Sequence, residues 1–491
     1  MPDRAIYRRP DGRCSLVPRT GWPADRQQSS NGEELSMLVK LLRYGSAGLL
    51  LAGWTGTALA FGPTEWTQYR MGPEHNAVFE DGKDIALPDA HYRTSDQVRA
   101  TPVIVDGRLY IGNHATGGLF AFSLEDGTAL WSDNHPWFRH APNWVHAETI
   151  TDGKRLYVAY GNRVFQSAEV RGTGESGVMA VDPETGAPLW NHLTVGEVMP
   201  TPALWNGLLY AVTGAAELRA IDPETGTLAW KLKLPGWVSM SSPAVTEDGM
   251  LYVGTMDAVV GVDLQQREIV WRHDEIASFT DVPPAVGTDN VVVITAVKPY
   301  ASATEEERAQ FPDAAKGYLH FIYGFDAANG KLLWKDLLGS GPKQDNNTSG
   351  APAIADGNVY VGSPYTKSVF AYDVSSGEKR WEHPTQNKVK GAPAIADGLV
   401  FFGDTSGLLY VVNAENGEAL KRRNGNHLPT RDALERKNGP PLPPRKVGGS
   451  LSNTKNTALA PAGPVVIGDT LFIGSQDGYV YRISIPDWIN Q

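Results

Sequence analysis

Mixed polar and aromatic side chains stand just before eight short apolar runs of the sequence, and together they could bind a ligand. Acids, bases, amides and an indole occur at corresponding places: Gln97, Arg99, His146, Met199, Trp237, Ser239, Thr280, Asp281, Asn346, Asn347, Lys388, Lys390, Asn453 and Asn456. Such variety is what recognition of a polar cofactor or substrate needs. Loop polarity without any ligand is the alternative explanation. The cofactor-binding candidates within this set are Arg99, Trp237, Asn346, Lys388 and Lys390.

Five of the eleven histidines suggest a second kind of chemistry, the coordination of copper or zinc by imidazole nitrogens. They are His114, His135, His140, His146 and His427. No pair has the i, i+4 spacing of a helical metal site, and histidines in loops are more often solvated than bound to metal. A histidine-based metal site is therefore a third interpretation, behind the two functions described below.

The single cysteine, Cys14, excludes several kinds of redox and metal chemistry. It lies within residues 1–36, which fit no targeting pattern and which we interpret as a non-native upstream extension. The chain after this segment has no disulfide, no thiolate metal site and no Cys-x-x-Cys-His motif for attaching haem. No cysteine follows the apolar run 44–53, so a lipid anchor is not expected either. If the protein is an enzyme, it is one without haem.

An export signal is predicted at residues 37–60. Lys40 and Arg43 precede the apolar run, and Ala58-Leu-Ala60 supplies small residues for cleavage before Phe61. The run is too short and too interrupted to span a bilayer, so we expect a periplasmic protein cleaved after Ala60. Residues 1–60 hold eight basic and five acidic residues, which leaves 36 bases against 50 acids in the remaining chain. This acidity disfavours nucleic acid or an anionic lipid surface as a partner.

A repeated motif organises the chain from residue 61 onward. The segment Asp182-Pro-Glu-Thr-Gly186-Ala-Pro-Leu-Trp190 recurs in strict or looser copies that end at Trp131, Trp230, Trp271, Trp334 and Trp381. Each copy follows a unit such as Ala351-Pro-Ala-Ile-Ala-Asp-Gly-Asn-Val-Tyr-Val-Gly362, two apolar runs divided by Asp-Gly. The pieces predict strand A, a tight turn, strand B, a loop, strand C, a tight turn and strand D. The tryptophans, on strand D, are expected to be structural and to pack between neighbouring sheets.

Eight such units predict an all-β fold, an eight-bladed β-propeller of four-stranded antiparallel blades that covers residues 61–491 as a single domain. The units begin near Thr101, Glu148, Thr201, Ser242, Pro283, Ala351, Ala392 and Gly463. The last unit lacks a fourth strand, and Thr64-Glu-Trp66-Thr-Gln-Tyr-Arg70 offers one. An N-terminal strand should therefore close the ring, which removes the open edge of a linear array.

The long insertions between strands are expected on one face of this ring. They cover residues 132–147, 161–177, 297–317 and 422–458, and we assign the last to the connection between strand D and the next strand A. Strand direction alternates, so loops from B to C and from D to A share a face, while the opposite face keeps its tight turns. Binding is expected on the elaborated face, over the central channel.

The repeats, the Asp-Gly turns and the segment Trp66-Thr-Gln-Tyr-Arg-Met-Gly-Pro-Glu-His-Asn76 resemble the pyrroloquinoline quinone (PQQ)-like propeller superfamily. This superfamily includes quinoprotein alcohol dehydrogenases and the non-enzymatic BamB-like proteins that support assembly of outer-membrane β-barrels. The resemblance covers residues 66–488. It implies the fold strongly and the function weakly, because many functions share this architecture.

For a dehydrogenase, the resemblance implies PQQ and calcium at the channel mouth. The segment Ala168-Glu169-Val-Arg171-Gly172 resembles the glutamate-bearing loop of these enzymes, which makes Glu169 and Arg171 cofactor-binding candidates. Asp257 takes the place of a metal-binding asparagine, and Asp281 stands where the catalytic base would be. Calcium would then be held by Glu169, Asp257 and Asp281. The aspartate at 257 and the lack of paired cysteines to cover PQQ depart from the family pattern.

For a binding protein of the BamB-like type, no cofactor is needed. The partner would be a periplasmic protein or a small molecule held on the loop-rich face. The sequence thus leaves three functions open. We rank a periplasmic binding or scaffolding protein first, a PQQ- and calcium-dependent alcohol dehydrogenase second and a histidine-based metal-binding propeller third.

Overall fold

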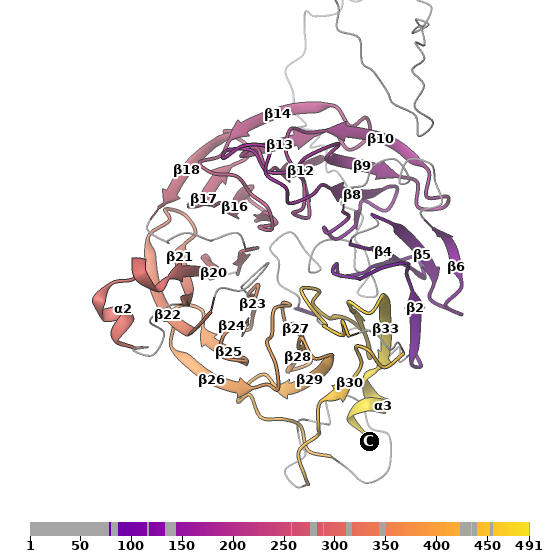
Figure 1. Ribbon diagram of the computed structural model, residues 1–491, viewed down its shortest axis with the longest axis vertical. Coiled ribbons are helices and arrows are strands. Elements are labelled where there is room, and N and C mark those ends of the chain that lie inside the picture. Colours follow the sequence, from indigo (N-terminus) through magenta and orange to yellow (C-terminus); the bar gives the residue numbers. More distant parts are fainter. Residues whose placement is uncertain are drawn as a thin grey trace, which may run out of the picture. The chain divides into compact units, whose positions relative to one another are not determined.

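Eight four-stranded antiparallel units form the ring of a β-propeller, as the repeats predict (Figure 1). The structure is a computed structural model, and it describes residues 78–79, 87–114, 117–132, 144–256, 258–274, 282–287, 289–310, 317–342, 350–422, 434, 439–451 and 455–490. No helix among these residues is long and apolar enough to cross a membrane.

Each of blades 1 to 4 is one meander in chain order. Blade 1 holds β3 (Val103–Val105), β4 (Arg108–Gly112), β5 (Leu119–Ser123) and β6 (Ala129–Ser132); blade 2 holds β7 (Ile150–Thr151), β8 (Leu156–Tyr160), β9 (Gly177–Val181) and β10 (Pro188–Leu193); blade 3 holds β11 (Ala203–Trp205), β12 (Leu208–Val212), β13 (Glu217–Ile221) and β14 (Leu228–Lys233); blade 4 holds β15 (Ala244–Val245), β16 (Met250–Gly254), β17 (Val259–Asp263) and β18 (Glu268–His273).

Blades 5 to 8 complete the ring. Blade 5 holds β19 (Ala285–Val286), β20 (Val291–Pro299), β21 (Tyr318–Asp326) and β22 (Leu332–Gly341); blade 6 holds β23 (Ala353–Ala355), β24 (Asn358–Ser363), β25 (Ser368–Asp373) and β26 (Lys379–Pro384); blade 7 holds β27 (Ala394–Ala396), β28 (Leu399–Gly403), β29 (Leu408–Asn413) and β30 (Arg445–Lys446); blade 8 holds β31 (Val465–Ile467), β32 (Thr470–Gly474), β33 (Tyr479–Ser484) and β2 (Ala90–Arg93). The short strand β1 (Val78–Phe79) pairs in parallel with β27, the first strand of blade 7.

Asp-Gly and Asn-Gly dipeptides build the tight turns between strands A and B. Asp106 and Gly107 both have positive φ (50° and 70°), and the same holds at Asn206-Gly207, Asp356-Gly357 and Asp397-Gly398. Two successive residues with positive φ are the requirement of the type I′ turn, whose twist matches that of the strands it joins. No atom would meet a side chain at Gly107, so this glycine is needed for its backbone conformation.

The strand-D tryptophans join each blade to the next one. In five blades the indole Nε1 donates a hydrogen bond to a carbonyl oxygen in the C-to-D turn of the following blade: Trp131 to Pro183, Trp190 to Pro223, Trp271 to Ala327, Trp334 to Val374 and Trp381 to Ala414, over 2.8 to 3.0 Å. The indole face packs on the glycine of the same turn, so that a Cβ at Gly186 would lie 2.6 Å from Trp131. The structural role predicted for these tryptophans is confirmed.

The C-to-D turn of blade 4 differs from those of the other junctions because it has no glycine. Its turn, Asp263 to Glu268, places Arg267 at positive φ (61°), and the guanidinium lies over the ring of Trp230 at 5.7 Å. A stacked cation here replaces the close glycine contact of the other junctions. This substitution accounts for the looser form of the repeat that ends at Trp271.

The N-terminal strand closes the ring, although the predicted segment is wrong. The fourth strand of blade 8 is β2, which pairs antiparallel with β33, and residues 64–70 lie outside the described residues. Tyr92 is fully buried at this junction, 3.8 Å from where Gly127 of blade 1 would carry a Cβ. Arg482 donates to the Tyr92 hydroxyl and to the carbonyl oxygens of Pro88 and Leu124. One buried arginine thus links both chain ends of the propeller to blade 1.

Three of the four insertions connect the strands that the sequence predicts. The fourth does not, because β30 pairs with β29 and is part of strand D of blade 7. The excursion from about residue 422 to 440 therefore interrupts an outer strand, where a D-to-A connection was expected. In blade 5 the insertion carries η2 (Tyr300–Ser302) and α2 (Glu305–Ala309), and a final helix, α3 (Ile485–Ile489), follows blade 8. Glu307 anchors α2 through Lys298 and Lys335.

Candidate functional site

Basic side chains gather around two buried histidines on the loop-rich face of blades 1 and 2. His114 follows β4, His146 and Trp144 precede β7, Arg99 precedes β3, and Arg163 lies in the loop between β8 and β9. We call these five residues the channel-mouth cluster. Only 8% of His114 and 6% of His146 is exposed to solvent. The sequence suggests both histidines as metal ligands and Arg99 as a cofactor-binding residue, and nothing in it indicates that the three belong to one cluster.

Ring packing fixes the two imidazoles of the cluster. The ring centroid of His114 lies 4.6 Å from that of Trp144 and 5.1 Å from that of His146, with the two histidines edge to face. Trp144 is held by two backbone hydrogen bonds of 3.1 Å to Gly161. Nδ1 of His114 is buried and has no hydrogen-bond partner among the described residues. A buried polar atom of this kind is where a water or ligand group is expected to bind.

Burial and the two arginines keep both histidines neutral. Burial, followed by the positive charges of Arg99 and Arg163, lowers the pKa of His114 to about 4, and Asp96 opposes this only in part. Burial, His114, Arg99 and Arg163 hold the pKa of His146 well below its ordinary value. The positive charges of both guanidinium groups therefore disfavour protonation of the same pair of imidazoles. Burial also lowers the pKa of Arg99 itself, so this cation has lost much of its hydration.

A second arginine site adjoins the cluster through the same loop. The guanidinium of Arg171 lies 4.9 Å from the ring centroid of Trp237 and 5.3 Å from that of Phe165. Its Nε lies 3.1 Å from Oε1 of Glu197, which is fully buried, in a geometry that is not that of a hydrogen bond. A charge pair inside the protein is stabilising only with close partners around it, and the two aromatic faces provide part of that environment.

Backbone hydrogen bonds fasten this loop onto blade 3. Arg171 N–H donates to Gly214 O (2.9 Å), Glu197 N–H to Arg171 O (2.7 Å) and Gly214 N–H to Glu197 O (2.8 Å). A Cβ at Gly172 would lie 2.2 Å from the Glu197 nitrogen, so only glycine allows this approach. The segment Gly172 to Gly177, with its several glycines, is thus explained by packing.

The predicted cofactor-binding residues are only partly brought together. Arg171 and Trp237 are in contact, and Arg99 lies in the channel-mouth cluster. Lys388 and Lys390 are half-buried just before β27 in blade 7. Glu169 is exposed in its loop, where its N–H donates to the Ser167 hydroxyl. Asn346, like His135, His140 and His427, lies outside the described residues.

The described residues do not assemble a calcium or transition-metal site. No three side chains of histidine, cysteine, aspartate or glutamate converge among them. Of the predicted calcium ligands, Glu169 is exposed, and Asp257 and Asp281 lie outside the described residues. PQQ and calcium therefore remain a prediction from sequence.

Trp144 and Arg163 are the members of the cluster that sequence reasoning missed, and Arg163 left signals in the sequence. The signals were its place in an inserted loop, two residues before an exposed aromatic ring, Phe165, and its spacing from Arg171. The histidines were noticed, but a metal was considered because their neighbours in space could not be read from the chain. Two guanidinium groups beside two imidazoles repel metal cations and attract anions instead.

The fold and its buried polar channel mouth define the class as a PQQ-like β-propeller. The sequence model of the family described as outer membrane protein assembly factor BamB matches residues 174–424 and again 322–487, and the chain belongs to this family. It is 26% identical to the tetrathionate hydrolase of Acidithiobacillus ferrooxidans over 428 residues, 75% of this chain and 82% of that protein. It is 23% identical to BamB of Salmonella typhimurium over 66% of this chain and 76% of that one.

Solved structures are similar in fold. BamB from Moraxella catarrhalis matches with a TM-score of 0.51 and 15% identity over 81% of this chain and 97% of that chain. A quinohemoprotein alcohol dehydrogenase from Comamonas testosteroni matches with a TM-score of 0.56 and 13% identity over 86% of this chain and 81% of that chain. At these identities the likeness establishes the propeller architecture and leaves the function to the site.

Proposed function

We propose that this chain is an exported enzyme that binds small sulfur oxyanions of the polythionate class at the channel mouth and hydrolyses them. The observation that carries the proposal is the channel-mouth cluster, in which Arg99 and Arg163 act on the buried pair His114 and His146. The similarity to a tetrathionate hydrolase, which extends over 75% of this chain, supports the same substrate class. Export rests on the signal predicted at residues 37–60.

A doubly charged oxyanion fits the charges of the cluster. Guanidinium groups bind sulfonate-like oxygens through several N–H donors at once, and a partly desolvated guanidinium binds an anion more strongly than one in water. The chain as a whole is acidic, with a net charge of −11, so a cationic channel mouth is a local region of positive potential on a negatively charged protein. Asp96 already acts on Arg99 and on His114, and a bound dianion would add negative charge to a cluster that holds two arginines.

The histidines supply the proton chemistry that hydrolysis needs. Attack by water forms a sulfur–oxygen bond and breaks the sulfur–sulfur bond, whose electron pair leaves with the departing anionic sulfur fragment. The step requires a group that accepts a proton from the water, and a neutral imidazole with a free nitrogen can do so. Nδ1 of His114 is such an atom. The nearby guanidinium charges make it a weak base in the free protein, and a bound dianion offsets those charges and raises its basicity. Binding of the substrate thus increases the basicity of the imidazole that accepts the proton.

The test is turnover of tetrathionate by the purified full chain, with loss of tetrathionate measured against time. Arg99→Gln and Arg163→Gln should each lower kcat/KM by about tenfold to a hundredfold, because each removes one charge-assisted contact. His114→Gln should lower kcat more than it raises KM. The matched control is Arg108→Gln, an exposed arginine at an A-to-B turn on the opposite face that pairs with Glu184. Equal activity in Arg99→Gln and Arg108→Gln would refute the assignment.

A second candidate function, support of membrane-protein assembly, is favoured by a different observation. The outer strand of blade 2 and the residues after it expose Leu189 (49%), Leu193 (55%) and Val195 (58%). An outer strand with exposed apolar side chains can pair with an extended segment of another protein. Under this proposal Leu193→Glu and Val195→Glu abolish binding of an unfolded outer-membrane β-barrel polypeptide, and Arg99→Gln has no effect on it. The two functions therefore respond to different variants.

A further inference from the structure

Blade 7 has a gap in its outer strand. Val412 bridges Ala419 on one side of the gap, and Leu409 pairs with Arg445 on the other. Between them, Tyr410 and Val411 have no strand partner on this edge among the described residues. In blade 3 the corresponding strand is continuous. Compared with a continuous strand D, two residues are therefore missing from the pairing in blade 7.

The sequence explains why the strand opens at this point. In blade 3, Lys233 pairs with the first residue of strand C and Trp230 pairs with Ala220. Counting back in the same way from Lys446 of blade 7, Pro443 and Pro444 stand where blade 3 has Trp230 and Lys231. Proline has no N–H to donate to a sheet ladder. Two prolines at these places leave Tyr410 and Val411 of β29 without a ladder partner on this edge among the described residues.

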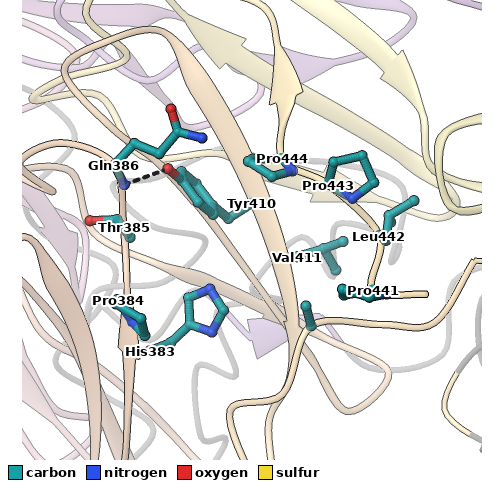
Figure 2. Close-up of a pocket in the computed structure, with 11 residues that line it drawn as sticks. His383, Pro384, Thr385, Gln386, Tyr410, Val411, Pro441, Leu442, Pro443 and Pro444 are labelled. Atoms are coloured by element: carbon teal, nitrogen blue, oxygen red, sulfur yellow. Dashed lines mark hydrogen bonds between the residues drawn. The ribbon is translucent and has the colours of Figure 1, made fainter.

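A pocket of about 430 Å³ occupies this opening, between the end of blade 6 and the edge of blade 7 (Figure 2). Its lining is mostly apolar and includes His383, Pro384, Thr385, Gln386, Tyr410, Val411, Ala419, Pro441, Leu442, Pro443 and Pro444. The volume lies in the range of sites that bind small ligands or single large side chains. Leu442 is buried and holds the proline segment in place, while Pro441 and Pro443 are exposed.

The same place in blade 3 is filled by a polar network. Arg219, which corresponds to Tyr410, donates to Nε2 of His192 over 3.1 Å and is paired with Glu217. Lys231 pairs with the same glutamate. In blade 7 the glutamate is replaced by Leu408 and the lysine by Pro444. The blade-7 pocket is thus the counterpart of a site that elsewhere in this protein holds a donor against a histidine.

His383 keeps the orientation of His192 but lacks its donor. Nδ1 of His383 lies 2.8 Å from the carbonyl oxygen of Gly417, as Nδ1 of His192 does from Gly226. A carbonyl oxygen only accepts, so Nδ1 carries the hydrogen and Nε2 is an acceptor. Burial lowers the pKa of His383, which keeps this form. The hydroxyl of Tyr410 is already engaged, accepting from the Gln386 N–H and donating to Asp404.

We propose that this pocket binds the tryptophan side chain of an extended segment of a partner protein. An indole matches the lining, because its flat apolar ring fits between prolines and Tyr410 and its single N–H can donate to Nε2 of His383. A lysine or arginine does not match, since none of the described residues that line the pocket carries a carboxylate. A polypeptide is favoured over free indole because the edge at Tyr410 and Val411 has no ladder partner among the described residues and borders the pocket, so the backbone that carries the ring can pair there.

The experiment uses the full chain and an acetylated, amidated tripeptide, Ala-Trp-Ala, that carries 5-fluorotryptophan. Fluorine NMR line broadening measures its binding. The same tripeptide methylated on the indole nitrogen should bind at least about tenfold more weakly, because it cannot donate to His383. Free 5-fluoroindole should also bind more weakly than the tripeptide. Equal binding of the methylated tripeptide, equal binding of free fluoroindole, or no broadening at about 5 mM tripeptide would overturn the proposal.

Variants provide the independent arm of this test. His383→Phe keeps the ring and removes the acceptor, and it should weaken binding of the tripeptide by about tenfold while leaving tetrathionate turnover unchanged. The matched control is His192→Phe, at the corresponding place between blades 2 and 3, which should leave tripeptide binding unchanged. Thermal unfolding of both variants verifies their folding. If His383→Phe fails to fold, the comparison of the two tripeptides on the unaltered chain still decides the outcome.

Discussion

Binding of a dianion at the channel mouth should draw protons from solution, and the extent can be worked out from the cluster. With a pKa of about 4, His114 is about 3% protonated at about pH 5.5. A dianion that offsets Arg99 and Arg163 raises this pKa, while burial, the largest cause of the shift, keeps it below the ordinary value of about 6.5. We therefore predict uptake of a fraction of one proton per bound dianion from His114, and of a further fraction if His146 follows.

Calorimetry of tetrathionate binding, repeated in two buffers with different enthalpies of ionisation, measures this uptake. The difference between the two binding enthalpies gives the number of protons bound. The uptake should fall toward zero near pH 7.5, where His114 is neutral in both states, and His114→Gln should remove the part that His114 contributes. The control is His192→Gln, whose imidazole faces Gly226 and Arg219 between blades 2 and 3. Uptake that is zero at pH 5.5, or unchanged in His114→Gln, would refute the coupling.

Three further predictions concern the stability of the ring. Gly417→Ala, at a φ of 71° and with Trp381 2.6 Å from the new Cβ, should lower the free energy of unfolding by about 2 kcal/mol or more in urea titration. Arg482→Met removes three hydrogen bonds at the ring closure and should destabilise the chain by about 3 kcal/mol, with blade 8 losing hydrogen-exchange protection first. Hydrogen bonds and two lysines lower the pKa of Glu307 to about 2, so its contribution is present above about pH 4.5 and is lost as the pH falls through 2. Glu307→Gln should remove that dependence and release α2 to proteolysis at neutral pH.

Much of the fold was predictable because the residues that make the contacts between blades recur in each repeat. A tryptophan on strand D and a glycine in the next C-to-D turn form one contact, and both residues are visible in the sequence. Asp-Gly pairs report the type I′ turns directly. The closing strand was misplaced because it carries Tyr92 in the role that the repeat gives to tryptophan. Arg482, which fixes that strand, has no counterpart in the repeat motif.

The candidate site was less predictable because its residues come from different connections between strands. Arg99, His114 and Arg163 stand in three separate connections of blades 1 and 2, and nothing in their spacing says that they meet. The histidines drew attention as metal ligands, a role that two neighbouring guanidinium groups disfavour. The blade-7 pocket did leave a signal in the sequence, because the repeat lacks its strand-D tryptophan and has Pro443 and Pro444 there instead. This segment was interpreted as part of a long loop, because the pairing of Arg445 with Leu409 is a long-range contact that the repeat does not show.

The most direct test of the anion site is a titration of the purified full chain with tetrathionate, compared with the double variant Arg99→Gln, Arg163→Gln. The account predicts one saturable site per chain in the unaltered protein, weakened by about a hundredfold or more in the double variant and unchanged in Arg108→Gln. Binding that survives loss of both arginines, or that is lost equally in Arg108→Gln, would contradict it.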